Sequence, residues 1–145
     1  MWTRFMDMAS GGGRKEKGLD YIYIEAPEEE AKVIFYNRFG HNPDRVSCTC
    51  CGADYSISSE EDLAQITAFE RGCRMANFDR FGNEVDDYKK GVMHLYVEAQ
   101  GAHYRPYQTL EEWQLSSKAL FIHASEIKPE EREGEVPEQG YVWRG

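Results

Sequence analysis

Three segments of the chain alternate between apolar and polar residues, and this alternation limits the fold more than any other feature. The segments lie at 21–26, 92–99 and 118–128. A repeat of two residues is typical of a β-strand with one face packed on a core. Each segment has an aliphatic side and a side that carries aromatic and polar residues, so we expect a sheet whose aliphatic face is covered. Shorter apolar segments at 2–6 and 54–58 predict two further strands.

Helical patterns stand between these strands. Residues 28–39 follow Pro27, begin with three glutamates and place apolar side chains at helical spacing, with Gly40 as the expected end. A second helix is predicted over 58–73, because serines near its start precede acidic residues by three positions, as in a capping box. The Thr and Glu at the ends of 109–112 predict a short third helix for the same reason.

Together these elements predict an α+β fold. We expect a single domain over 1–145, since a chain of this length suits one core. The sheet is expected to be small and mixed or antiparallel, with helices packed on one face and a cysteine-containing turn between the first and second helices. The glycine-rich and basic stretch 8–19 predicts a flexible loop, 75–91 a polar loop, and 128–140 an acidic, mobile tail segment.

The composition of the chain indicates which classes of partner and which cellular compartment we expect. Hydrophobic residues make up 41% of the chain and its formal net charge is -9. A globular protein fits these values, whereas a general nucleic-acid binder would present a basic face. No apolar run approaches the ~20 residues of a membrane span, and the first ten residues do not read as a signal peptide. We therefore expect a cytoplasmic protein with reduced thiols and no membrane partner.

Three of the four cysteines lie within four residues, and their spacing suggests a metal site. Cys48 and Cys51 have the C-x-x-C spacing of a zinc knuckle, and Gly52 follows the second of them. Cys73, predicted to end the second helix, is the expected third zinc ligand, and Cys50 or a histidine the fourth. The alternative is that the thiols are buried as small hydrophobic groups. Redox chemistry is less favoured, because the motif does not open a helix.

The glycine loop is the one locally basic stretch of an acidic chain. Gly11, Gly12 and Gly13 precede Arg14 and Lys15. Successive backbone N–H groups beside basic side chains can hold an anion. The sequence lacks a P-loop or dinucleotide pattern here, so a flexible linker is the competing interpretation.

The aromatic side of the predicted strands is a third candidate surface. If the three strands are neighbours, this side forms one binding face that includes Tyr21, Tyr23, Tyr96 and Phe121. A protein partner or a covering helix explains the tyrosines, and single-stranded nucleic acid stacked on the rings is a weaker alternative.

The same face carries the residues of an enzymatic alternative. His94 and His123, together with Glu98, could act as an acid–base pair in a small hydrolase or a nucleotide-acting enzyme. No nucleophile or second motif supports this interpretation, so we favour a protein without catalytic residues.

Three stretches of the sequence carry a resemblance to known proteins. They read FMDM-SGGG-K near the start, YIYIEAPEEEAKVIFYNRFGHNPDRVSCTCCGADYSI in the middle and ER-G-VP-QGYVW at the end. In these stretches the chain resembles a group of small uncharacterised bacteriophage proteins. The resemblance implies a phage accessory protein in the host cytoplasm, of the kind that binds and redirects or inhibits a host factor such as an antiviral nuclease. We therefore expect a binding module for a host protein, stabilised by zinc if the cysteines hold one.

Overall fold

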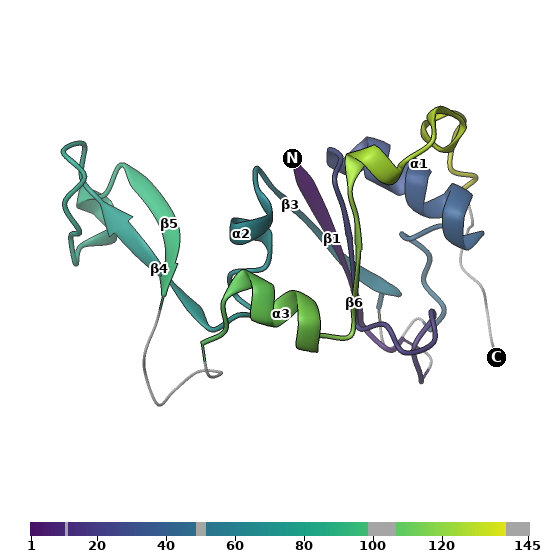
Figure 1. Cartoon of the computed structure of the whole chain (residues 1–145), viewed down its shortest axis with the longest axis horizontal. Coiled ribbons are helices and arrows are strands. Elements are labelled where there is room, and N and C mark those ends of the chain that lie inside the picture. Colours follow the sequence, from purple (N-terminus) through teal and green to yellow (C-terminus); the bar gives the residue numbers. More distant parts are fainter. Residues whose placement is uncertain (11, 49–51, 99–106, 139–145) are drawn as a thin grey trace. The chain divides into compact units, whose positions relative to one another are not determined.

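The computed structural model describes residues 1–10, 12–48, 52–98 and 107–138 (Figure 1). The chain divides into two compact units, which are described separately below. The first unit comprises Met1–Glu61 and Lys118–Gly145, and the second unit comprises Asp62–Ser117. The predicted α+β class with a mixed sheet is confirmed.

A four-stranded sheet forms the frame of the first unit. Its strand order is β3, β1, β2, β6, with bounds Tyr55–Glu60, Trp2–Asp7, Tyr21–Ile24 and Ala119–Ile122. The β3–β1 and β1–β2 pairs are antiparallel and the β2–β6 pair is parallel. The predicted strands β2 and β6 are confirmed, and their aliphatic residues meet at directly opposed positions such as Ile24 and Ile122. Strand β2 is not half-buried as predicted, because Tyr23 on its aromatic side is also fully buried.

Helix α1 (Glu28–Phe39) packs on one face of this sheet and completes the core (Figure 1). Phe35 is fully buried, and its ring lies 4.8 Å from that of Phe5 on β1. The helix ends where predicted, because Gly40 adopts a left-handed φ of 78° and donates its N–H to the Tyr36 carbonyl. The core therefore follows from the local patterns of the helix and the strands.

The second unit contains a two-stranded antiparallel sheet and short helices. Strands β4 and β5 pair over six positions, and the structure describes no third strand beside them. Helix α3 has the predicted capping box, in which Thr109 accepts from the Glu112 N–H and Glu112 accepts from the Thr109 N–H. The element bounds are α2 Leu63–Ile66, β4 Cys73–Phe78, η1 Tyr88–Lys90, β5 Met93–Glu98 and α3 Leu110–Ser116.

The predicted helix over 58–73 is wrong. Strand β3 continues to Glu60, because its register with β1 places Ser59 opposite Thr3, where the two hydroxyls hydrogen-bond at 2.8 Å. Only the four residues of α2 are helical, and Asp62 caps them. Pairing with β1, which is distant in the sequence, outweighs the local capping pattern.

Two further expectations are corrected downstream. Cys73 opens β4 instead of ending a helix, and the first part of the predicted loop 75–91 belongs to that strand. The last predicted strand ends at Ile122, after which the chain forms the short helices η2 (Ala124–Glu126) and η3 (Pro129–Arg132).

The acidic segment after Lys128, predicted to be a mobile tail, lies along α1 within the described residues. The Asn37 side chain donates to the carbonyls of Glu131 and Glu133, and the Arg38 guanidinium pairs with the Glu131 carboxylate at 2.6 Å. Further along, the Asn42 side chain donates to the Pro137 carbonyl. None of the described helices is long and apolar enough to cross a membrane.

Candidate functional site

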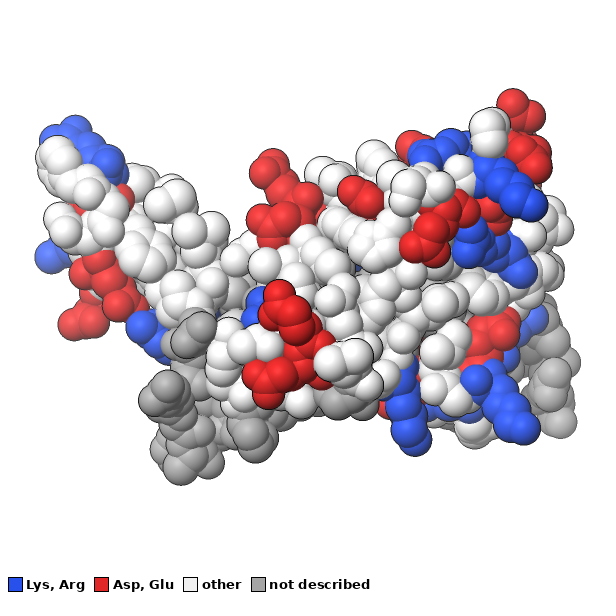
Figure 2. Space-filling view, in the orientation of Figure 1, with Lys and Arg blue, Asp and Glu red and all other residues white. Residues whose placement is uncertain are grey.

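The β4–β5 ribbon, formed by residues 73–78 and 93–98, exposes apolar side chains. Its register places Leu95 opposite Ala76 and Met93 opposite Phe78, so these four side chains share one face. Ala76 is buried, but Met93 and Leu95 are 44% and 37% exposed. Figure 2 shows mainly uncharged side chains over β4 and β5. Apolar surface left open in this way is typical of a surface that another protein covers.

Within the described residues, the two edges of the ribbon are held by a few hydrogen bonds, and no further strand pairs with them. On β5, the Gln65 side-chain amide pairs with the Tyr96 backbone, accepting its N–H at 3.2 Å and donating to its carbonyl at 3.4 Å. On β4, the Asn77 carbonyl accepts from the Val85 N–H. Two-stranded ribbons are marginally stable in water without additional packing. A protein that covers this ribbon would therefore stabilise it.

The ribbon continues into a compact turn at residues 79–83, which we call the tip turn. The Asp79 carboxylate accepts hydrogen bonds from the N–H groups of Phe81 and Asn83, both at 2.9 Å. The Asp79 N–H donates to the Asn83 carbonyl, and Gly82 takes a φ of 82°. These bonds fix the turn and leave Phe81 74% exposed.

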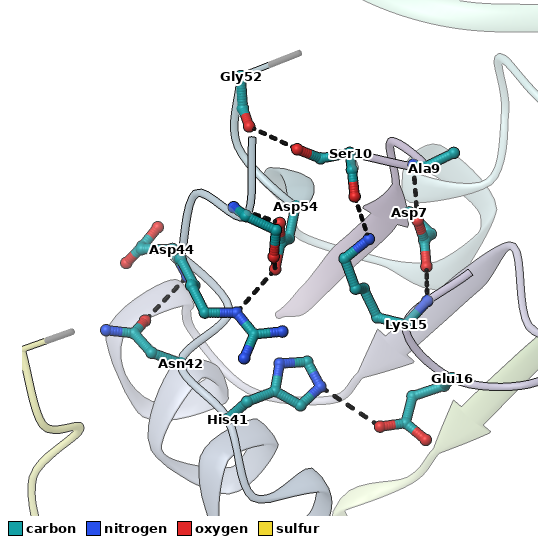
Figure 3. Close-up of polar contacts among 12 residues, drawn as sticks. Asp7, Ala9, Ser10, Lys15, Glu16, His41, Asn42, Asp44, Gly52 and Asp54 are labelled. Atoms are coloured by element: carbon teal, nitrogen blue, oxygen red, sulfur yellow. Dashed lines mark hydrogen bonds and ion pairs between the residues drawn. The ribbon is translucent and has the colours of Figure 1, made fainter. Parts of the chain in front are cut away.

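A cluster of buried polar groups links the sheet of the first unit to the cysteine turn (Figure 3). Asp54 is fully buried and accepts three hydrogen bonds, one from the Arg45 guanidinium and two from Ser47. Burial alone would raise the pKa of the Asp54 carboxyl, but the hydrogen bonds and the charge of Arg45 outweigh burial and lower this pKa. Asp54 therefore remains ionised and ties the turn to β3.

The glycine loop is tied to the same sheet through Asp7. The Asp7 carboxylate accepts from the N–H groups of Ala9 and Lys15, both at 2.7 Å. The Ser10 hydroxyl donates to the Gly52 carbonyl, which joins the glycine loop to the cysteine turn (Figure 3). The described part of the loop thus has a defined backbone connection to β1.

The basic groups of the predicted anion site are engaged within the chain. The Arg14 guanidinium pairs with Asp20 at 2.9 Å, and the Lys15 ammonium donates to the carbonyls of Ser10 and Gly13. Gly12 and Gly13 are exposed and have positive φ angles, whereas Gly11 lies outside the described residues. Anion binding here stays a prediction, and it would compete with these internal contacts.

His41 extends the polar cluster toward the aromatic core. Its Nε2 lies 3.3 Å from the Glu16 carboxylate, and its ring stacks on Tyr55 at 6.1 Å and meets Phe35 edge-on at 5.3 Å. Burial, with the nearby charges of Asp7, Glu16 and Asp54, raises the pKa of the Tyr55 hydroxyl well above its ordinary value. Tyr55 therefore stays protonated, and the cluster serves as a scaffold for two loops.

The four cysteines do not form one described site. Cys48 lies in the first unit, where its carbonyl accepts from the Gly52 N–H at 3.1 Å, and Cys73 lies in the second unit. Cys50 and Cys51 are outside the described residues. Among the described residues, no group of three or more His, Cys, Asp or Glu side chains is placed to hold a metal ion. The zinc site stays a prediction.

The predicted aromatic face is divided between two sheets. Tyr21, Tyr23 and Phe121 lie on β2 and β6, where the rings of Tyr23 and Phe121 stack at 4.9 Å. Tyr96 lies on β5, in the other sheet. Tyr23 is fully buried, so its ring is not available to an incoming base.

The residues of the enzymatic alternative are divided in the same way. His94 lies on β5 with its Nδ1 2.6 Å from the Asn77 side chain, and Glu98 is opposite Cys73 in the β4–β5 register. His123 follows β6 and packs edge-on against Trp2 at 5.2 Å. The sheets thus do not combine these residues on one shared face.

A shallow acidic cleft lies between α1 and the C-terminal segment. Its volume is about 400 Å³, and its lining includes the carboxylates of Glu29, Asp44, Glu135 and Glu138. Lys32 lies 3.1 Å from Asp44 within it. Burial alone would lower the pKa of Lys32, but the hydrogen bond and charge of Asp44, aided by nearby glutamates, raise it. The lysine therefore stays charged and offsets part of the acidic lining.

The polar cluster and the tip turn were not anticipated from the sequence. The cluster joins Asp7, Glu16, His41 and Asp54, which come together only when β1 pairs with β3. The sequence does contain a turn pattern here, because Asp79 precedes Gly82 by three residues, a spacing that is common in turns. The polar composition of this stretch nevertheless predicted one long loop.

Known proteins give no independent guide to these sites. Comparison with models of protein families, with curated proteins and with solved structures finds no match to the chain.

Proposed function

We propose that this chain is a small accessory protein of a bacteriophage that binds a protein of the host cell and inhibits or redirects it. The observation that carries the proposal is the exposed apolar face of the β4–β5 ribbon. Met93 and Leu95 lie on this face, and Val92, which precedes β5, is 69% exposed. Burial of such side chains against a partner contributes about 25 cal/mol for each Å² of apolar surface removed from water.

The charge of the chain also favours a protein partner over a nucleic acid. A formal net charge of -9 opposes the approach of a phosphate backbone. The apolar side chains of Met93, Leu95 and Val97 make this ribbon face a local exception to the acidic character, although Arg74, paired with Glu84, lies on the same face. An apolar patch bordered by an ion pair suits a docking surface with a desolvated centre. The proposed activity needs no catalytic residue, because occupation of the host protein's surface is sufficient to inhibit it.

Charge substitutions on the ribbon test the proposal. We expect Met93→Asp and Leu95→Asp to abolish capture of one host protein from a lysate of the host bacterium, while Leu115→Asp leaves capture unchanged. Leu115 is a matched control, because it is 89% exposed on α3 and away from the ribbon sequence. Circular dichroism and thermal unfolding establish that all three variants are folded.

Three outcomes would contradict the proposal. Capture that is equal for all variants would exclude the ribbon as the docking surface. Capture of nothing above background by the wild-type chain would remove the host-protein function. A dimer of the pure chain that Met93→Asp dissociates would assign the ribbon to a second copy of the chain.

We further propose that the cysteine turn holds a structural zinc ion, with Cys48, Cys50 and Cys51 as ligands. Cys73, the other ligand predicted from the sequence, lies in the second unit. The C-x-x-C spacing supports a zinc ion in the turn, as does the bridge between Cys48 and Gly52 that closes the turn at a positive φ of 85°. Elemental analysis should find about one zinc per chain, and titration of the native protein with a thiol reagent should find the cysteine thiols protected. Absence of metal with freely titrating thiols would remove zinc without affecting the ribbon.

A further inference from the structure

The tip turn presents one aromatic ring and one guanidinium as a unit. The Arg80 guanidinium carbon lies 4.9 Å from the centroid of the Phe81 ring. Phe81 is 74% exposed, and Arg80 is exposed as well. Stacking of this kind is attractive and holds the two side chains together. Phenylalanine and arginine are both enriched in protein interfaces relative to the rest of the surface.

The backbone beneath these side chains is fixed before any partner arrives. Three N–H groups of the tip turn donate to Asp79, two to its carboxylate and one, from Gly82, to its carbonyl. Phe78 and Glu84 then form an antiparallel bridge, and Glu84 pairs with Arg74 at 2.6 Å. A fixed turn loses little conformational entropy on binding, so a partner gains most of the contact energy of the side chains that it presents.

Charge distribution around the tip turn indicates the chemistry of the partner. Within the described residues, Arg80 makes no ion pair, whereas the carboxylates of Asp79 and Glu84 accept hydrogen bonds inside the segment. The charges of Lys89 and Lys90 in η1 are matched by those of Asp86 and Asp87 just before them, so the positive charge that the tip turn itself presents is that of Arg80. Figure 2 shows both basic and acidic side chains at this end of the hairpin. A guanidinium without an ion pair is best matched by a carboxylate, which it binds through two parallel hydrogen bonds.

We propose that Phe81 and Arg80 are the anchor of the interaction, with Phe81 entering an apolar pocket of the partner protein and Arg80 binding a carboxylate at the mouth of that pocket. This inference rests on the proposed function, because it names the part of the hairpin that gives the docking its specificity. The ribbon face then packs around the anchor and excludes water from it.

Photo-cross-linking in the full-length chain identifies what the tip turn touches. The photoreactive residue p-benzoylphenylalanine replaces Phe81 in one variant, Leu95 in a second and Leu115 in a third, and each is irradiated in host cells. We expect position 81 to cross-link to one host protein, at a pocket lined by apolar side chains with an Asp or Glu at its mouth. Position 115 should give no such product.

Affinity measurements with that purified protein then test the anchor. Phe81→Ala should weaken binding by about thirtyfold or more, and Arg80→Ala by about tenfold. Arg80→Lys should recover only part of the loss, because lysine keeps the charge but not the paired hydrogen bonds. Leu115→Ala should bind as the wild type does. Since Phe81 and Arg80 are exposed, these variants should unfold at the wild-type temperature.

Each other outcome is decisive. Cross-links from position 95 but not from 81, or unchanged affinity of Phe81→Ala, would overturn the anchor and leave the ribbon proposal standing. Cross-links from 81 to nucleic acid would overturn the anchor in favour of base stacking. No cross-link from either position would overturn both proposals. An unchanged affinity of Arg80→Ala would overturn the carboxylate contact.

Discussion

Phe35 in the first unit and Phe81 in the second carry the same side chain in opposite environments. Phe35 is fully buried among Phe5, Tyr55 and His41, whereas Phe81 is 74% exposed at the tip turn. The first ring contributes to stability through packing, and the second contributes almost nothing to the folded chain alone. Under the proposed function, the first unit carries the packing that stabilises the fold and the tip turn carries the contact with a partner.

Polar groups follow the same division. In the first unit, the carboxylates of Asp7 and Asp54 are buried and each accepts several hydrogen bonds. At the tip turn, the Arg80 guanidinium is exposed and contacts a ring. A buried group that has all its hydrogen bonds fixes a structure, while an exposed cation held on a rigid turn is available to a partner.

Truncation of the two phenylalanines gives the largest expected contrast. Phe35→Ala should lower the free energy of unfolding by about 3–5 kcal/mol, because it removes buried surface and leaves a cavity. Phe81→Ala should change it by less than about 0.5 kcal/mol, as is usual for exposed sites. Urea unfolding monitored by circular dichroism measures both. Equal losses in the two variants would mean that Phe81 is buried in solution, which would contradict the contrast between the two rings.

Removal of one charge from the polar cluster has the next largest effect. Asp54→Asn keeps the shape of the side chain but loses the ion pair with Arg45 and turns an N–H group toward donors of Ser47. We expect a loss of about 2–3 kcal/mol, the range for a hydrogen-bonded buried charge. Asp44→Asn is the matched control, since Asp44 is exposed beside the same turn and should lose much less. Similar losses for both variants would contradict the structural role of the cluster.

The pH dependence of stability follows from the lowered pKa of Asp54. In an unfolded chain the pKa of an aspartate carboxyl is about 3.9, and in the folded chain the pKa of Asp54 is lowered. Stabilisation by Asp54 is therefore complete above the unfolded pKa and is lost as the pH falls through the folded pKa. The stability gap between wild type and Asp54→Asn should be constant near neutral pH and should close in acid. If the stability difference between wild type and Asp54→Asn widened in acid, the pKa of Asp54 would be raised on folding and not lowered.

Local patterns predicted much of the first unit because its elements carry their own signals. The helix from Glu28 shows glutamates at its start and Gly40 at its end, and strands β2 and β6 show clear alternation. The residues 58–60 carry a capping pattern instead, and only the partner strand β1 decides that they are extended. Long-range pairing cannot be read from a local pattern, and this explains the failed helix.

The candidate sites were harder to predict for the same reason. Alternation in β5 correctly placed Met93, Leu95 and Val97 on one side, but it could not show that β5 belongs to a separate two-stranded sheet. The polar cluster joins residues from four stretches of the chain, so no local sequence pattern predicts it. The exposed ring of Phe81 is visible only in three dimensions.

The edge of the ribbon offers a smaller test within the second unit. Gln65→Ala removes both contacts with the Tyr96 backbone and should cost about 1 kcal/mol. Hydrogen exchange of the Tyr96 amide should become about fivefold faster. Gln65→Glu keeps the acceptor for the Tyr96 N–H and should protect this amide better than Gln65→Ala does. Unchanged exchange in the alanine variant would show that this edge is held by other contacts.

Two surface ion pairs of equal length provide the smallest and most closely matched contrast. Arg38 and Glu131 in the first unit, and Arg74 and Glu84 in the second, are each separated by 2.6 Å. In both pairs, the hydrogen bond from the arginine is the main cause that lowers the pKa of the glutamate. Arg38→Ala and Arg74→Ala should therefore raise the pKa of Glu131 and Glu84, respectively, as NMR titration of each carboxyl would measure.

The pairs should differ in what their loss does to the chain. Arg38 also donates to the Glu126 carbonyl, so Arg38→Ala should loosen the 129–137 segment and speed its cleavage in limited proteolysis. Exposed ion pairs contribute little to the free energy of unfolding, so the global stability should change little. Arg74→Ala should leave the same segment as resistant as in the wild type. Faster cleavage in both variants would show that the segment responds to general loosening, and not to its own contact with α1.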